Sequence, residues 1–232
     1  LPMWRVSTPN RPLTGLTVLV VEDSRFASEA VRLLCLRSGA GIRRADTVRA
    51  ALRHLQTYRP GAVLVDMGLP DGDGAEVIRA IAGNTPRVPV ILGISGDPDN
   101  RQAALDAGAD GFLAKPVESL AGFQQAILDA LPPGDRPQGL RLLSDTVVIP
   151  DRGALRDDLA HVAEVLSLAD DTAAIDYIAR FLAGVARLAH DRPLEVAATA
   201  LARDHAQGAP LATDLARISG MVQDRLAMVQ RL

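Results

Sequence analysis

The chain has 232 residues, of which 48% are hydrophobic and 23% charged, and this composition excludes an intrinsically disordered protein. The formal net charge of −3 lacks the basic surplus that is typical of nucleic-acid-binding proteins, so nucleic acid is not expected as a partner. No run of about 18 apolar residues occurs, so we expect no transmembrane segment and a soluble, cytoplasmic protein. The single cysteine, Cys35, excludes an intrachain disulfide.

Short β-branched runs alternate with amphipathic helical patterns from residue 16 onward. The runs predict strands at 16–21, 41–44, 62–66, 88–94 and 111–114, and the periodicity predicts helices near 24–38, 47–57, 73–82, 97–107 and 117–131. Five strand–helix repeats predict an α/β fold, a doubly wound five-stranded parallel sheet with helices on both faces. The first, third and fourth runs are continuously apolar and belong at the centre, whereas the second holds two arginines and belongs at an edge.

A second domain is expected after the sheet. Residues 132–150 are rich in Pro and Gly and predict a linker, which includes one short strand over Thr146–Ile149. Residues 151–232 are helical in pattern and rich in alanine, and they predict a small all-α domain of three to four helices. The helix starts are expected at Asp151, at Asp170 or Asp171, at Asp191 before Pro193, and at Ala209 before Pro210. Residues 1–15 form an N-terminal extension, and residues 16–131 the first domain.

Polar side chains follow the carboxyl ends of four predicted strands. Glu22 and Asp23 follow the first strand, Asp66 ends the third, Ser95 follows the fourth, and Lys115 follows the fifth. In a doubly wound parallel sheet these strand ends form one rim, where ligands bind. Lys115 is the only lysine in a chain that otherwise uses arginine for its basic side chains.

Crowded carboxylates of this kind attract a hard cation. Magnesium prefers oxygen ligands and keeps several waters, so Asp23, Asp66 and the backbone carbonyl of Gly68 are expected to hold it, with Glu22 contacting it through water. The ion, the lysine ammonium and the serine hydroxyl would neutralise phosphoryl oxygens while a carboxylate attacks in line. The set therefore suits phosphoryl transfer.

Each of these residues also has a plain structural interpretation. Glu22 and Asp23 before Ser24 are compatible with an ordinary helix N-terminus, and a lone acid such as Asp66 is usually a solvated strand end. Ser95 reads as a cap and Lys115 as a loop cation. Their joint appearance, each at the end of the proper strand, is what the plain interpretations leave unexplained.

The motifs "VLVVEDS", "VLVDMGLPDGDG", "VILGISGD" and "ALDAGADGFLAKPV" resemble, in this order, the receiver domain of two-component response regulators. The resemblance covers residues 16–131 and implies a flavodoxin-like sheet of order 2-1-3-4-5. It also implies that a histidine kinase or histidine phosphotransfer protein phosphorylates Asp66 in a magnesium-dependent step. Glu22 and Asp23 would be the acidic pair for magnesium, and Lys115 would contact the phosphate.

The same resemblance makes Ser95 the switching hydroxyl and Phe112 the aromatic residue that rotates inward on activation. Such a domain is a phosphoacceptor with at most self-dephosphorylation, not a turnover enzyme. A haloacid-dehalogenase-like phosphatase also uses an aspartate, magnesium and a lysine. It usually carries Asp-x-Asp at the first strand, whereas the nucleophile candidate here ends the third.

The helical half leaves three hypotheses open. A helical interaction or dimerisation module is favoured, because Leu211, Leu215, Ile218, Val222 and Val229 form one apolar stripe and Ile175, Ile178, Leu182 and Val185 another. We therefore expect a homodimer or a target protein as partner. A DNA-binding regulator would need a basic recognition helix, which the pattern lacks. A degenerate histidine phosphotransfer-like domain would use His161, His190 or His205, but none is followed by the Lys-Gly usual in such modules.

Overall fold

The computed structural model describes residues 7–137, 143–168 and 172–229, and the contacts within it divide the chain into two units. The first comprises the residues up to 23 together with 28–149, and the second comprises 24–27 and 150–232. The first six residues of the expected N-terminal extension, and the alternative helix starts at Asp170 and Asp171, lie outside the described residues.

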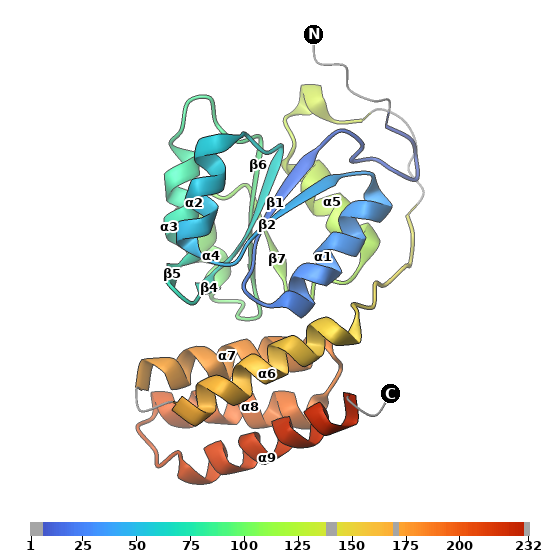
Figure 1. The fold of residues 1–232 in the computed structure, drawn as a ribbon. Coiled ribbons are helices and arrows are strands. Elements are labelled where there is room, and N and C mark those ends of the chain that lie inside the picture. Colours follow the sequence, from blue (N-terminus) through green and yellow to red (C-terminus); the bar gives the residue numbers. More distant parts are fainter. Residues whose placement is uncertain (1–6, 138–142, 169–171, 230–232) are drawn as a thin grey trace. The chain divides into compact units, whose positions relative to one another are not determined.

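A parallel five-stranded sheet forms the centre of the first unit (Figure 1). Its strands are β1 (Thr17–Val21), β2 (Gly41–Ala45), β3 (Ala62–Asp66), β6 (Val90–Ser95) and β7 (Gly111–Ala114), in the order β2-β1-β3-β6-β7. Strands β4 (Gly68–Leu69) and β5 (Gly72–Asp73) form a separate antiparallel hairpin and are not part of this sheet. The expected order 2-1-3-4-5 is therefore confirmed, with the arginine-bearing β2 at one edge.

Helices cover both faces of this sheet (Figure 1). They are α1 (Arg25–Ser38), α2 (Val48–Thr57), α3 (Gly74–Ala82), α4 (Asn100–Asp106) and α5 (Leu120–Ala130). On one face, Leu19, Val63 and Ile91 of the central strands pack in one apolar cluster with residues of α2, α3 and α4. The continuous burial of β3 and β6 agrees with the central positions that their apolar runs predict.

The expected helix near 97–107 starts three residues later than its pattern indicates. The N–H of Asn100 donates to the carbonyl of Asp97 at 3.2 Å, so residues 97–100 form a turn before α4 begins. The carboxylate of Asp97 also accepts from the N–H of Asp99 at 3.0 Å, and this side-chain bond to the backbone holds the turn.

Segments outside the sheet and helices are also tied to the first unit. Leu13, in the expected N-terminal extension, is buried, and its N–H donates to the carbonyl of Ser38 at 3.0 Å. The strand expected over Thr146–Ile149 is only an isolated antiparallel bridge between Val147 and Ser119. Its partner is the short loop before α5, which offers too few residues for a ladder, although Val148 is fully buried.

The second unit has four helices within its described residues (Figure 1). They are α6 (Arg152–Leu168), α7 (Thr172–Leu188), α8 (Arg192–Ala206) and α9 (Ala212–Val229). Asp191 caps α8 by accepting from the N–H of Leu194 at 3.1 Å, with Pro193 in the first turn, as its sequence predicts. The start expected at Ala209 moves to Ala212. None of the described helices is both long and apolar enough to cross a membrane.

The two apolar stripes of this unit face its own core. Ile218 and Val222 of α9 are buried in the bundle, and Leu211 and Leu215 pack against the same cluster. The members of the α7 stripe are buried as well, and the side chain of Val229 lies outside the described residues. These stripes therefore form an intramolecular core, so they do not support pairing of two copies through them.

Candidate functional site

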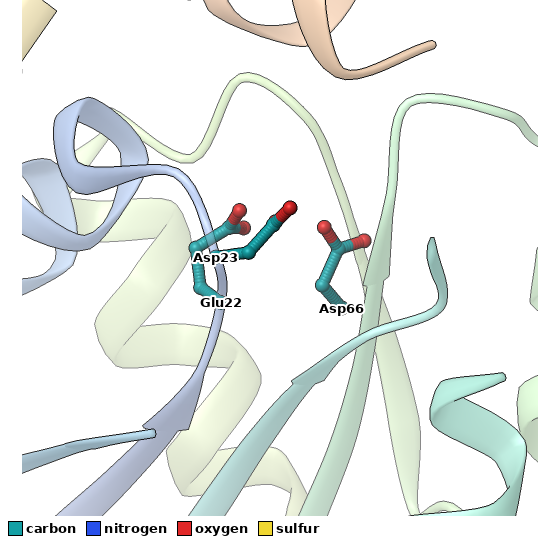
Figure 2. A group of neighbouring side chains, drawn as sticks. All are labelled: Glu22, Asp23 and Asp66. Atoms are coloured by element: carbon teal, nitrogen blue, oxygen red, sulfur yellow. The ribbon is translucent and has the colours of Figure 1, made fainter. Parts of the chain in front are cut away.

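Three carboxylates meet at the carboxyl edge of the sheet (Figure 2). Val21 and Val65 are register partners on the adjacent strands β1 and β3, so the residues that follow them end side by side. Glu22, Asp23 and Asp66 each place one carboxylate oxygen within 4.8 Å of the other two. A set of oxygen donors without nitrogen or sulfur is the kind that a hard divalent cation prefers.

Lys115 lies between two of these carboxylates. Its Nζ donates to Asp66 Oδ2 at 2.7 Å and lies 2.8 Å from Glu22 Oε2. The N–H of Lys115 donates to the carbonyl of Ser95 at 2.9 Å, which fixes the backbone at the end of β7 against β6. With 15% of its side chain exposed, the ammonium is a buried counter-charge, and it offsets the cost of burying two acids.

Burial and charge shift the protonation of this pair. Burial is the largest influence on Asp66 and raises the pKa of its carboxyl to about 6; Lys115 opposes this rise, and Glu22 adds to it. Burial also works against the charge on Lys115, but Asp66 and Glu22 outweigh it and raise the pKa of the ammonium. Lys115 therefore stays charged at neutral pH, and Asp66 is ionised but more basic than an ordinary aspartate.

The loop after Asp66 is packed against the end of β3. The N–H of Gly68 donates to Asp66 Oδ1 at 3.3 Å. Gly74 approaches so closely that an added Cβ would lie 2.0 Å from the carbonyl oxygen of Asp66. Asp71, which the sequence analysis missed, accepts from the N–H of Val48 at 2.7 Å and anchors the loop to the start of α2. Its Pro-Asp-Gly turn signal was available in the sequence.

Ser95 is the last residue of β6 and is buried. Its Oγ accepts from the N–H of Asp97 at 3.0 Å and from Nδ2 of Asn100 at 2.9 Å. Within the described ranges, no hydrogen bond joins this oxygen to Asp66. Asn100 is a second residue that sequence reasoning missed; its only signal is a polar side chain five positions after the serine.

Phe112 lies in β7 and is half-buried against the cluster under α2, α3 and α4. A Cβ added at Gly93 would lie 3.3 Å from Cδ2 of Phe112 and 2.6 Å from Cβ of Ala104. The missing side chain at this position of β6 therefore makes room for both the ring and α4.

The histidines of the second unit have different surroundings. His161 is exposed on α6, and its ring lies edge-on to Phe181 with centroids 5.7 Å apart. His205 is half-buried in the last turn of α8, with Nδ1 at 3.9 Å from Asp176 Oδ1. His190 follows α7 with a φ of 55°, which is the left-handed conformation common at helix ends.

Residues 18–127 match the family model described as the response regulator receiver domain. The KDP operon transcriptional regulatory protein KdpE of Escherichia coli is 35% identical over 99 residues, which cover 43% of this chain and 44% of that protein. The response regulator MprA of Mycobacterium tuberculosis strain H37Rv is 32% identical over 140 residues, 59% of this chain and 61% of that one. The chain thus spans between about half and three fifths of the length of these relatives.

Solved receiver-domain structures are similar to about half of the chain. That of the sensor histidine kinase PA1611 from Pseudomonas aeruginosa, solved with magnesium in its active site cleft, is 28% identical with a TM-score of 0.44, covering 49% of this chain and 95% of that one. CheY4 of Vibrio cholerae is 26% identical with a TM-score of 0.42, covering 50% and 100%.

One relative is named a transcriptional regulator, so these comparisons do not support the expectation that nucleic acid is not a partner. They do bear on the family of the first unit. Its residues match the family model over most of their length, and its sheet has the strand order that the resemblance implies. Residues 18–127 of this chain are a receiver domain of the response regulator family.

Proposed function

We propose that the chain is a two-component response regulator that accepts a phosphoryl group on Asp66 from a histidine kinase or a histidine phosphotransfer protein. The observation that carries the proposal is the placement of Asp66 between a three-carboxylate cluster and the buried ammonium of Lys115. A buried acid in such a position costs stability unless something compensates its charge, which is typical of a residue kept for chemistry.

Asp66 is the nucleophile in this reaction. One of its carboxylate oxygens attacks the phosphorus of a phosphohistidine, the new P–O bond forms, and the P–N bond breaks with its electron pair going to the imidazole of the donor. The product is an acyl phosphate on Asp66. Because its pKa is raised to about 6, this carboxylate is more basic than usual and still ionised at neutral pH.

A magnesium ion fits the oxygen donors of this site. Asp23 and Asp66 would hold it, with Glu22 acting through water and the backbone carbonyl of Gly68 as a further donor. When bound, the ion neutralises charge on the phosphoryl oxygens. The chain's own residues do the positioning: Lys115 holds Asp66 Oδ2 and donates to the incoming group, and the N–H of Gly68 orients Asp66 Oδ1.

Phosphorylation replaces a single carboxylate charge with a group that carries roughly −2. Ser95 then donates its hydroxyl to the new oxygens, and the half-buried Phe112 turns into the space that Ser95 vacates. These movements alter the surface formed by α4, β7 and α5, and that surface is the switch that the rest of the chain reads.

The helical unit is the output of this switch. We propose that it binds a target protein or a second copy of the chain through a surface other than the stripes of α7 and α9, because those stripes are buried in its own core. A transcriptional output is the second candidate, favoured by the name of the relative KdpE. The cytoplasmic location remains a prediction.

The test is labelling of the purified chain by acetyl phosphate, followed by mass spectrometry of the intact protein. We expect a magnesium-dependent phosphoryl adduct that is labile to hydroxylamine and is lost in Asp66→Asn. Asp129→Asn is the matched control and should still be labelled, because Asp129 is exposed on α5 and accepts from Nε2 of Gln125 in the same helix. Persistent labelling of the Asp66 variant would refute the assignment.

A further inference from the structure

We propose that Asn100 is a positioning residue that holds the Ser95 hydroxyl in its resting place and sets how readily Ser95 reaches a phosphoryl group on Asp66. The inference rests on the proposed function of Asp66 and Ser95. Asn100 lies on α4, and its side chain bonds to Ser95 and not to the carboxylates or Lys115.

The geometry around Ser95 carries the proposal. A serine hydroxyl has two acceptor lone pairs and one proton to donate. Both lone pairs of Ser95 Oγ are occupied, one by the N–H of Asp97 at 3.0 Å and the other by Nδ2 of Asn100 at 2.9 Å. Ser95 is buried, so water competes little for these bonds. One donor in the turn before α4 and one in its first residue therefore hold the oxygen in place and restrict how the hydroxyl can rotate.

A phosphoryl group on Asp66 needs the one proton that this hydroxyl can donate. Its oxygens only accept hydrogen bonds, so Ser95 must turn its O–H toward them, and every donor that stays bonded to its oxygen restricts that turn. The N–H of Asp97 is a backbone donor two residues away, in the same local turn as the serine. The side chain of Asn100 is a separate tether from five residues along the chain. The bond from Asn100 therefore opposes the turn of Ser95 toward a phosphoryl group.

The Asn100 side chain is not explained by helix capping. Capping side chains accept hydrogen bonds from the free N–H groups of the first turn. Asn100 instead donates from its amide nitrogen, and it is the first residue inside α4 and not its N-cap. The bond to Ser95 thus satisfies no N–H of the helix. Its effect is to restrain the Ser95 hydroxyl.

The test is the affinity of the full chain for beryllofluoride in the presence of magnesium, measured by isothermal titration calorimetry. Removing one net hydrogen bond that opposes binding should make Asn100→Ala bind roughly 2- to 12-fold more tightly than the wild type. Gln102→Ala is the matched control, because it deletes an amide from the same helix whose partner is the exposed Asp106, and its affinity should stay unchanged. Unchanged or weaker binding by Asn100→Ala would overturn the proposal.

A second pair of variants separates positioning from a general effect on the fold. In a Ser95→Ala background the hydroxyl is absent, so adding Asn100→Ala should no longer change the affinity. An Asn100 effect that persists without the hydroxyl would make the residue merely structural. Failure of the wild type to bind beryllofluoride would instead refute the proposed function itself, whereas binding by the wild type with no difference in Asn100→Ala would refute only this inference.

Discussion

Replacing Asp66 by asparagine is expected to stabilise the metal-free receiver domain at neutral pH. Burial raises the pKa of this carboxyl to about 6, whereas an ordinary aspartate titrates near 3.9. Each pKa unit corresponds to about 1.4 kcal/mol, so ionised Asp66 costs the folded state up to about 3 kcal/mol at pH 7 to 8. Asparagine has almost the same shape, stays neutral, and keeps an oxygen for the ammonium of Lys115. We expect a gain of about 1–3 kcal/mol in the free energy of unfolding.

The sign of the pH dependence follows from the raised pKa. Below the pKa that Asp66 has in the unfolded chain, its contribution to the free energy of unfolding is fully present. That contribution is lost as the pH rises through about 6, the pKa in the folded state. The gain from Asp66→Asn should therefore be largest at pH 7 to 8, shrink between pH 6 and 4, and vanish near pH 4.

The assay is urea denaturation of the full chain in a chelator at several pH values, followed by circular dichroism. The receiver transition is identified as the one that magnesium shifts in the wild type. Asp110→Asn is a matched control of opposite sign, because Asp110 pairs with Arg87 at 2.9 Å and accepts from the N–H of Ile91 at 2.8 Å, and it should lose about 1–2 kcal/mol. The reasoning is wrong if Asp66→Asn gains nothing at pH 8, or if its gain does not change with pH.

Three further predictions concern the same unit. Gly74→Ala would place Cβ 2.0 Å from the carbonyl oxygen of Asp66, so it should cost about 3 kcal/mol in urea denaturation and slow acetyl phosphate labelling about 100-fold. Gly68→Ala, with no atom within 4 Å, should change stability by less than about 0.5 kcal/mol, and equal behaviour of the two would contradict the steric argument. Lys115→Ala removes the ammonium that competes for the carboxylates, so calorimetry should show about tenfold tighter magnesium binding, and weaker binding would speak against that competition. Cys35 is buried and its pKa is raised to about 12 by burial, so a thiol reagent at pH 8 should label the protein only after unfolding in urea; fast labelling of the native chain would disprove this.

The sequence predicted the sheet well because its central strands are buried on both faces. Continuous apolar runs such as those of β3 and β6 have few alternative structures, and the bounds of β3 agree with the expectation residue for residue. Weaker local signals gave poorer results. The start of α4 moved by three residues because a turn precedes it, and the strand expected at Thr146–Ile149 is one bridge because its partner loop is short.

The acidic residues of the site were also predictable, since the rim of a parallel sheet collects whatever follows each strand. The partners of these residues were not. The bond from Asn100 to Ser95 and the anchoring of the Asp66 loop by Asp71 depend on which atoms meet across turns that sequence periodicity does not describe. The apolar stripes of the second unit could be read either as core or as an interface, and only the packed bundle shows that they are core.

The amino-acid sequence by itself determined the α/β class of the first unit, its strand order through a resemblance, and which side chains stand at the carboxyl edge of the sheet. These properties follow from local patterns, because a strand buried on two faces is a continuous apolar run in the sequence and its end is where that run stops. Only the tertiary structure decided that Lys115 joins Glu22 to Asp66, that burial makes Asp66 unusually basic, and that Ser95 is held by α4. Those properties depend on distances between residues far apart in sequence and on the exclusion of water around them, and neither exists until the chain has folded.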